Sequence, residues 1–260
     1  MMMNNNHTFA ICAYKESNYL EDCIKSLLNQ TIKTNIIIST STPNEHIKKL
    51  AEKYNIKLHI NTGKSGIGED WNFAVSCVDT KYVTIAHQDD IYEPKYVEEI
   101  LNNITDDTVI AFTDYGELRS GEKINKSKLL KIKRIMLFPL KIFKSSKFIR
   151  KLSLAFGNSI CCPSVTLNIE KVGKPPFKIG LKSNLDWDTW FEYTKIKGEF
   201  IYISKILMYH RIHEESTTSS TIENNIRQEE DYIMYRKFWP KWVANILIRH
   251  YTKSINSNKL

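Results

Sequence analysis

The chain has 260 residues, of which 42% are hydrophobic and 25% are charged, enough for one large α/β domain with a sizeable core. Its net charge of +8 is uneven, because residues 123–151 hold eleven Lys or Arg and residues 236–260 hold six, both without an acid, which leaves −9 elsewhere. An acidic body argues against a nucleic-acid-binding protein. We also expect a cytoplasmic protein, because no signal-peptide or membrane-span pattern occurs and the five cysteines form no Cys-x-x-Cys pair.

Strand and helix patterns alternate along the first half of the chain. Apolar runs predict strands over residues 8–13, 35–39, 56–60, 82–87 and 108–113. Amphipathic patterns predict helices over residues 18–28, 43–54, 69–78 and 94–103, with Pro43 in the first turn of the second helix. This alternation predicts an α/β fold with a mostly parallel sheet and helices on both faces.

The strand that ends at His87 leads directly into Gln88, Asp89 and Asp90. Two adjacent carboxylates at the end of a buried strand are costly to desolvate unless a positive group lies against them. A divalent cation takes carboxylate oxygens, and strand ends are where open α/β sheets hold ligands. The residues therefore indicate a metal-assisted site for a phosphorylated ligand. An Asp-rich turn, in which Asp90 caps a helix that starts near Pro94, explains them equally well.

A second polar group opens an amphipathic helix at residues 185–191. Asp186 and Asp188 have two possible roles. They are acids in the first turn, where negative charge interacts favourably with the helix dipole, or one of them is a general base beside Trp187. Further along, His210 and His213 are candidate ligands at a spacing of three residues, although a histidine in a strand is more often a satisfied polar residue.

Residues 126–154 interleave apolar side chains with Lys and Arg, and Pro139 should divide this segment into two short amphipathic helices. We favour an interfacial role for it, because cationic helices with an apolar face lie on anionic membranes. For the similar C-terminal segment, ordinary packing against the core is an equally good explanation.

Residues 8–216 together resemble family 2 of the glycosyltransferases, which are inverting nucleotide-sugar enzymes with the GT-A fold. Residues 9–31 are similar to the opening strand and helix of the family, and residues 87–94 to its Asp-x-Asp-Asp segment. Residues 185–190 are similar to its Glu-Asp-x-Asp-x-Trp motif, and residues 209–216 to its Tyr-Arg-x-His-x-x-Ser segment. Four motifs in this order make the resemblance strong.

The chain departs from the family pattern at four places. His87 replaces the first Asp of the Asp-x-Asp triplet, and residues 39–42 lack the acid that reads the nucleobase in the family. Trp71 stands where the family often has Arg, and Leu185 replaces the usual Glu. The identity of the donor base is therefore open.

The resemblance implies a GT-A type, Rossmann-like sheet and four regions. These are a nucleotide-sugar-binding half (1–120), a basic amphipathic helical insertion (121–155), the acceptor and catalytic half of the same domain (156–220) and a C-terminal helical extension (221–260). It also implies a metal-dependent transfer of a sugar, with inversion, from a nucleoside-diphosphate sugar to a glycan or lipid-linked acceptor. Members of the family in bacteria usually build surface polysaccharides, such as capsule or lipopolysaccharide, so the resemblance suggests a role in the synthesis of such a polysaccharide.

The resemblance assigns roles to particular residues. Asp186 is the expected base, and Asp89 with His213 is expected to hold Mn²⁺ or Mg²⁺. The expected donor-binding residues are Ala13, Tyr14, Glu16, Thr40, Trp71, Asn72, Gln88, Asp89 and Asp90. The expected acceptor residues are Asn158, Trp187, Asp188 and Arg211.

Two other classes of protein stay open. A nucleotidyltransferase could use a similar sheet and acidic metal site, although residues 13–17 supply little of the Gly-rich, basic loop that it needs. A non-catalytic membrane-binding protein of the same fold gains support from His87 in place of the first Asp. The expected partners are the sugar donor, the acceptor and an anionic membrane surface, with no nucleic acid. We expect a protein that is free in the cytoplasm or peripheral on the inner face of the membrane.

Overall fold

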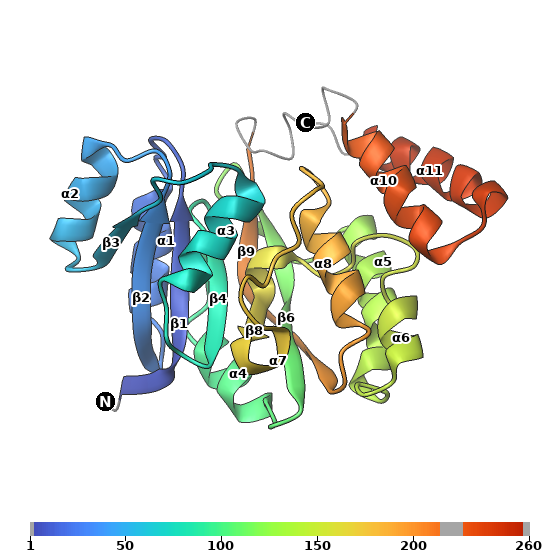
Figure 1. The fold of residues 1–260 in the computed structure, drawn as a ribbon, viewed down its shortest axis with the longest axis horizontal. Coiled ribbons are helices and arrows are strands. Elements are labelled where there is room, and N and C mark those ends of the chain that lie inside the picture. Colours follow the sequence, from blue (N-terminus) through green and yellow to red (C-terminus); the bar gives the residue numbers. More distant parts are fainter. Residues whose placement is uncertain (1–2, 214–225, 257–260) are drawn as a thin grey trace.

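The computed structural model describes residues 3–213 and 226–256, and Figure 1 shows a single sheet with helices on both sides. The strands are β1 (Met3–Ala13), β2 (Lys33–Thr40), β3 (Lys57–Ile60), β4 (Tyr82–His87), β5 (Ile91–Tyr92), β6 (Thr108–Arg119), β7 (Glu122–Ile124), β8 (Val165–Asn168) and β9 (Glu199–Ile212). The helices are α1 (Leu20–Leu28), α2 (Glu45–Lys53), α3 (Ile67–Ser76), α4 (Tyr96–Asn103), α5 (Lys128–Leu137), η1 (Phe138–Lys141), α6 (Lys147–Leu152), η2 (Cys162–Ser164), α7 (Ile169–Val172), α8 (Leu185–Tyr193), α10 (Ile226–Phe238) and α11 (Lys241–Asn256).

The strands form one sheet in the order β3-β2-β1-β4-β8-β6-β9-β5, and β7 pairs with β6. The predicted parallel arrangement holds for β3, β2, β1 and β4, whereas β8 is antiparallel to both β4 and β6. Cys12 near the end of β1 is paired with His87 at the end of β4. The loops that follow these two strands therefore leave the sheet at the same edge, where the site is expected.

Helices cover both faces of the sheet because successive side chains of a strand point to opposite faces. Phe9 and Ile11 of β1 pack into a core with apolar residues of α1, α2 and α4. Ala10, between them in sequence, packs into a second core with residues of α3, α8 and α10. The prediction of helices on both faces is confirmed.

Two helix starts differ from the prediction. Asn44 caps α2 by accepting a hydrogen bond from the Ile47 N–H at 2.9 Å, so Pro43 lies outside the helix. No helix begins at Pro94, because β5 follows the acidic turn and α4 begins only at Tyr96. Asp90 takes no part in capping α4, which removes the explanation of the acid pair as a helix cap.

The basic insertion folds as predicted into two short helices, α5 and α6, with Pro139 in the 3₁₀ turn η1 between them. The two C-terminal helices α10 and α11 lie side by side next to α8 (Figure 1). Ser216, the last residue of the fourth motif, and the predicted boundary at residue 220 lie outside the described residues. Within the described ranges, no helix combines the length and the apolar character needed to cross a bilayer.

Candidate active site

The loops after β1 and β4 are joined by the side chain of Gln88. Its Oε1 accepts a hydrogen bond from the Tyr14 N–H at 3.0 Å, and its Nε2 donates to the Tyr14 carbonyl at 2.9 Å. The Tyr14 side chain is 52% exposed, and Glu16 is exposed nearby in sequence. Gln88 therefore shapes the predicted donor-binding loop, and Tyr14 and Glu16 are open to a ligand.

Two other predicted donor residues are enclosed. Ala13 is only 4% exposed and Thr40 only 2%. The Thr40 Oγ1 accepts a hydrogen bond from the Thr42 N–H at 3.0 Å, so it stabilises the turn after β2. The Thr42 hydroxyl in turn accepts from the Lys15 N–H at 2.6 Å. The side chains of Ala13 and Thr40 are therefore enclosed, and donor binding by these two residues stays a prediction.

The side chains of Trp71 and Asn72 are also occupied. Trp71 is 9% exposed and stacks on the His87 ring with 5.2 Å between ring centroids. The Asn72 amide donates to the Phe177 carbonyl and accepts from the Phe177 N–H, both at 2.8 Å. Trp71 therefore supports His87 and Asn72 fixes the Phe177 backbone, while direct donor binding by these two residues stays a prediction.

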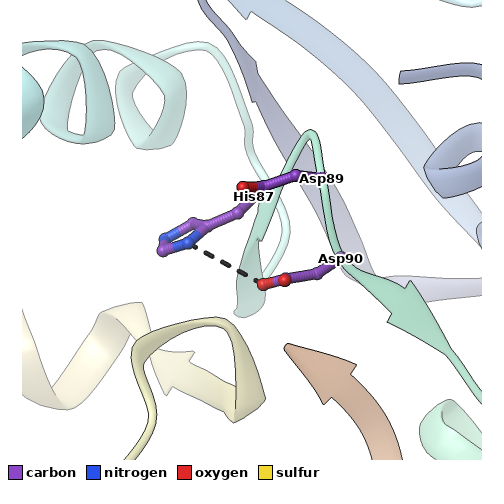
Figure 2. A group of neighbouring side chains, drawn as sticks. All are labelled: His87, Asp89 and Asp90. Atoms are coloured by element: carbon purple, nitrogen blue, oxygen red, sulfur yellow. Dashed lines mark ion pairs between the residues drawn. The ribbon is translucent and has the colours of Figure 1, made fainter. Parts of the chain in front are cut away.

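Figure 2 shows His87, Asp89 and Asp90 gathered at the turn after β4. Asp90 is fully buried, and its Oδ1 binds the Arg211 N–H at 2.9 Å and His210 Nδ1 at 3.0 Å. Burial opposes protonation of His210, but the Asp90 carboxylate outweighs it and raises the pKa of His210 to about 9. The hydrogen bonds of Asp90 to His210 and Arg211 tie the acidic turn to β9.

Asp89 lies against His213, the other predicted ligand, with 2.9 Å between His213 Nε2 and Asp89 Oδ2. Burial opposes ionisation of Asp89, but the hydrogen bond with His213 and the charge of His87 outweigh it and lower the pKa of Asp89 to about 2. The Arg211 guanidinium donates to the Asp89 carbonyl at 2.8 Å. Arg211 thus holds the acidic turn, while its role in acceptor binding stays a prediction.

The group fits a divalent cation. One possible ligand atom from each of His87, Asp89 and Asp90 lies within 4.8 Å of the others. Among the described residues, neither His87 Nε2 nor Asp90 Oδ2 has a hydrogen-bond partner, although both are buried. Buried polar atoms normally have partners, and carboxylate oxygens suit Mg²⁺ or Mn²⁺. His87 therefore adds a donor to the predicted pair of Asp89 and His213.

Asp186 is the second residue of α8, and it is held by its neighbours. Its Oδ2 accepts from the Asn158 amide at 2.6 Å, and its Oδ1 accepts from the Trp187 N–H at 2.8 Å. Burial raises the pKa of Asp186 above the ordinary range of an aspartate, which makes its carboxylate a stronger base. Asn158, a predicted acceptor residue, is therefore in direct contact with the candidate general base Asp186.

Asp186 and the acidic turn act on a common neighbour, the thiol of Cys161. Burial raises the pKa of Cys161, and the charges of Asp90 and Asp186 raise it further. Packing joins the same two places, because Trp71 stacks on His87 with 5.2 Å between centroids and contacts Phe177 at 5.0 Å. Phe177 in turn contacts Trp190 of α8 at 6.1 Å, so a chain of aromatic rings runs from the acidic turn to the helix that carries Asp186.

The two predicted acceptor residues that follow the base are not open to a large ligand. Trp187 is fully buried, and its indole N–H donates to the Leu154 carbonyl at 3.1 Å. Asp188 is 6% exposed and is paired with Lys237 and with Lys178. The amphipathic pattern could not predict that Trp187 and Asp188 are more enclosed than Asp186, because α8 is packed on most sides.

Two groups at the site were not predicted. Lys133 of α5, expected to face a membrane, donates instead to the Tyr115 hydroxyl at 2.8 Å, and burial lowers its pKa. Its positive charge opposes the rise in the pKa of Asp186. Glu230 of α10 accepts hydrogen bonds from backbone N–H groups just before α8. The spacing of apolar residues predicts only which face of a helix is apolar. The contacts of Lys133 and Glu230 therefore could not be predicted from the sequence.

The fold and the site define a transferase with the GT-A fold. The chain belongs to glycosyl transferase family 2, because the model of that family matches residues 8–172. This membership favours glycosyl transfer over the nucleotidyl transfer left open above, and an enzyme over a non-catalytic protein.

Two curated relatives are both uncharacterized glycosyltransferases. The one from Rickettsia prowazekii is 26% identical over 236 residues, which cover 85% of this chain and 68% of the relative. The one from Rickettsia conorii is 25% identical over 246 residues, which cover 91% of this chain but only 39% of the relative.

Two solved structures share the fold. S. aureus TarS 1–349 in complex with UDP-GlcNAc has a TM-score of 0.65 and 13% identity, covering 94% of this chain and 70% of that one. Mannosyltransferase PcManGT from Pyrobaculum calidifontis, in complex with GDP-Man and Mn²⁺, has a TM-score of 0.65 and 11% identity, covering 94% and 69%.

Proposed function

We propose that this protein is a metal-dependent inverting glycosyltransferase that uses a nucleoside-diphosphate sugar. The observation that carries the proposal is the contact of Asp89 with His213 in the acidic turn, together with Asp186 on a helix that aromatic packing joins to that turn. The nucleotide-sugar complexes of TarS and PcManGT, the second of them with Mn²⁺, support the donor class and the ion.

Asp186 accepts the proton of the acceptor hydroxyl as that oxygen attacks the anomeric carbon. The bond from this carbon to the diphosphate breaks in the same step, so the configuration inverts. The Asn158 amide holds the Asp186 carboxylate in place. Asp89 and His213, with His87, would hold Mn²⁺ or Mg²⁺, which supplies positive charge for the departing diphosphate.

We assign the donor to the edge of the sheet where β1 and β4 end. Tyr14 and Glu16 are the predicted donor residues with exposed side chains, and Gln88 fixes the loop that carries them. The absence of an acid in residues 39–42 leaves the base of the donor to experiment.

We further propose that the acceptor is a glycan or lipid-linked precursor of a bacterial surface polysaccharide, and that the enzyme works in the cytoplasm at the membrane. The support is an exposed apolar surface on the insertion, defined here as the insertion surface. Its large side chains are 44–70% exposed and comprise Ile132, Ile135, Phe138, Ile142, Phe143 and Phe148. Ile132 and Ile135 lie three residues apart in α5, a spacing that puts helical side chains on one side, and Phe138 follows at the start of η1.

Such a surface indicates an interaction partner, because soluble monomers rarely expose large apolar patches. Exposed Lys128 and Lys131 border it, so an anionic leaflet complements both its charge and its apolar character. Lys133 and Arg134 do not belong to it, since Lys133 binds Tyr115 and Arg134 binds Asp114 at 2.5 Å.

A screen of nucleotide sugars for release of nucleoside diphosphate, with Mn²⁺, with Mg²⁺ and with EDTA, tests the enzymatic proposal. We expect one donor, or a few, to release diphosphate with the metal only. Equal release in EDTA would contradict the metal assignment, and no release from any donor in the presence of acceptor extracts would contradict the function.

A further inference from the structure

The carboxylate of Glu230 in α10 binds the chain at the start of α8. Its Oε1 accepts from the Lys182 N–H at 2.7 Å, and its Oε2 accepts from the N–H groups of Ser183 at 2.8 Å and Asn184 at 3.0 Å. Glu230 is only 7% exposed. Three charge-assisted hydrogen bonds from one buried carboxylate fix the backbone of residues 182–184 strongly.

The contact reaches the N-terminal end of α8 through the Asn184 N–H, since the other two N–H groups precede the helix. Asn184 is the N-cap residue of α8, but its side chain makes no capping hydrogen bond and donates instead to Asp231 Oδ1 at 2.7 Å. The first N–H groups of a helix need acceptors, and a negative charge near them is favourable. Adjacent acids of α10 therefore hold both the backbone and the side chain of the residue where α8 begins, two positions before Asp186.

α10 and the residues just after it also contact the segment that leads to Asn158. The Tyr235 hydroxyl donates to the Phe156 carbonyl at 3.3 Å, and the Tyr235 ring packs edge-on against Trp187 at 5.3 Å between centroids. Just beyond α10, the Trp239 indole donates to the Ala155 carbonyl at 2.7 Å. The segment held in this way leads to Asn158, the residue that binds Asp186. Both supports of the base therefore rest on α10 and its end.

We propose that Glu230 is a positioning residue for Asp186, acting through the backbone of residues 182–184. This inference rests on the proposed function, because it takes Asp186 to be the base. A glutamine at position 230 keeps the shape of the side chain but loses its charge and one of its two acceptor oxygens. The start of α8 then loosens, and Asp186 moves from its position for proton transfer.

The test compares Glu230→Gln with Glu229→Gln, a matched change at an exposed neighbour on the same helix. We expect Glu230→Gln to lower kcat by about 10- to 100-fold, as small displacements of catalytic groups do, while the KM for the donor stays within twofold. Hydrogen exchange of the amides of residues 182–184 should become faster. Glu229→Gln should change neither. Unchanged kcat in folded Glu230→Gln, or unchanged exchange, would overturn the inference.

A double mutant separates positioning from general loss of structure. If Glu230 acts through Asp186, then Glu230→Gln has little further effect on the residual rate in an Asp186→Asn background. An equal fall in rate in both backgrounds, or a parallel rise in the donor KM, would mean that Glu230 supports the structure only. Full turnover by Asp186→Asn alone would instead overturn the assignment of the base, which is a distinguishable result.

Discussion

Asp89 and Asp90 are adjacent, yet their surroundings give them different tasks. Asp90 is fully buried and neutralises His210, whereas Asp89 shares its oxygen with His213. The strand-end pattern at residues 82–90 predicted the position of both acids. It could not distinguish them, because the partner of Asp90 is 120 residues further along the chain.

We therefore expect the two alanine variants to fail in different ways. Asp89→Ala should abolish turnover and metal-dependent donor binding while the protein stays folded. Asp90→Ala leaves the charged His210 without its buried partner, which typically costs about 3–5 kcal/mol of unfolding free energy. Denaturant unfolding and donor titration with Mn²⁺ measure the two effects. Near-normal turnover of Asp89→Ala in Mn²⁺ would contradict the assignment of the site.

Asp186 should control both the rate and its dependence on pH. Loss of a general base typically costs about 10²–10⁴-fold in rate, so Asp186→Asn should lose turnover to this extent yet bind the donor normally. The base works when ionised, and burial raises its pKa. The rate should therefore fall, as pH is lowered, at a higher pH than for an ordinary aspartate.

Asp188→Asn is the matched comparison for this variant. Asp188 is paired with Lys237 and Lys178 instead of facing a ligand, so the loss of rate should be smaller. If Asp188→Asn were the more damaging change, the base would have to be reassigned to Asp188.

Among the secondary-structure elements, the helices of the basic insertion were the least completely predicted from the sequence. The pattern located two helices divided at Pro139, and this is confirmed. It did not show which side faces outward, because α5 has apolar residues on both sides. Leu130 and Leu137 are buried, whereas Ile132 and Ile135 are exposed. Tertiary contacts of Lys133 and Arg134 decide the orientation.

The insertion surface should bind anionic vesicles in a manner that depends on salt. Lys128→Glu with Lys131→Glu should reduce co-sedimentation, because each basic residue near an anionic surface contributes about 1 kcal/mol. Ile135→Ser with Phe138→Ser should reduce it further by removing apolar contact. The control is Lys49→Glu with Lys57→Glu, two exposed lysines of the β2–β3 side. Equal pelleting with neutral and anionic vesicles, or none, would exclude this membrane role.

The contact between α10 and α8 should make stability depend on pH. Asp231 is 2% exposed, and burial raises its pKa to about 6. Between about pH 4 and pH 6 the folded state therefore binds more protons than the unfolded state, so stability falls as pH rises through this window. The total fall is about 3 kcal/mol, because each unit of difference in pKa corresponds to about 1.4 kcal/mol.

Asp231→Asn should abolish this slope and raise the free energy of unfolding at pH 7, since the new amide oxygen can still accept from Asn184. Denaturant unfolding at pH 4, 5, 6 and 7 measures it. A slope that is unchanged in the variant would assign the pH dependence to another group.

For the whole molecule, the first half of the fold was the more predictable part. Apolar runs locate these strands within the sequence, and their alternation with helices predicts the parallel direction that β1 and β4 have. The second half depends on contacts between distant segments, such as β8 between β4 and β6 and α10 against α8. These contacts have no local pattern. The motifs therefore located Asp89, Asp186 and His213, and the resemblance named Asn158 and Arg211, but nothing in the sequence indicated the support that Glu230 of α10 provides.

The anomeric configuration of the transferred sugar, determined by NMR on the product made with the active donor, is a direct test of the single-displacement mechanism. One displacement assisted by one base, Asp186, predicts a product linkage of the opposite anomeric configuration to the donor. A product that retains the configuration of the donor would contradict the single-displacement mechanism and the role assigned to Asp186.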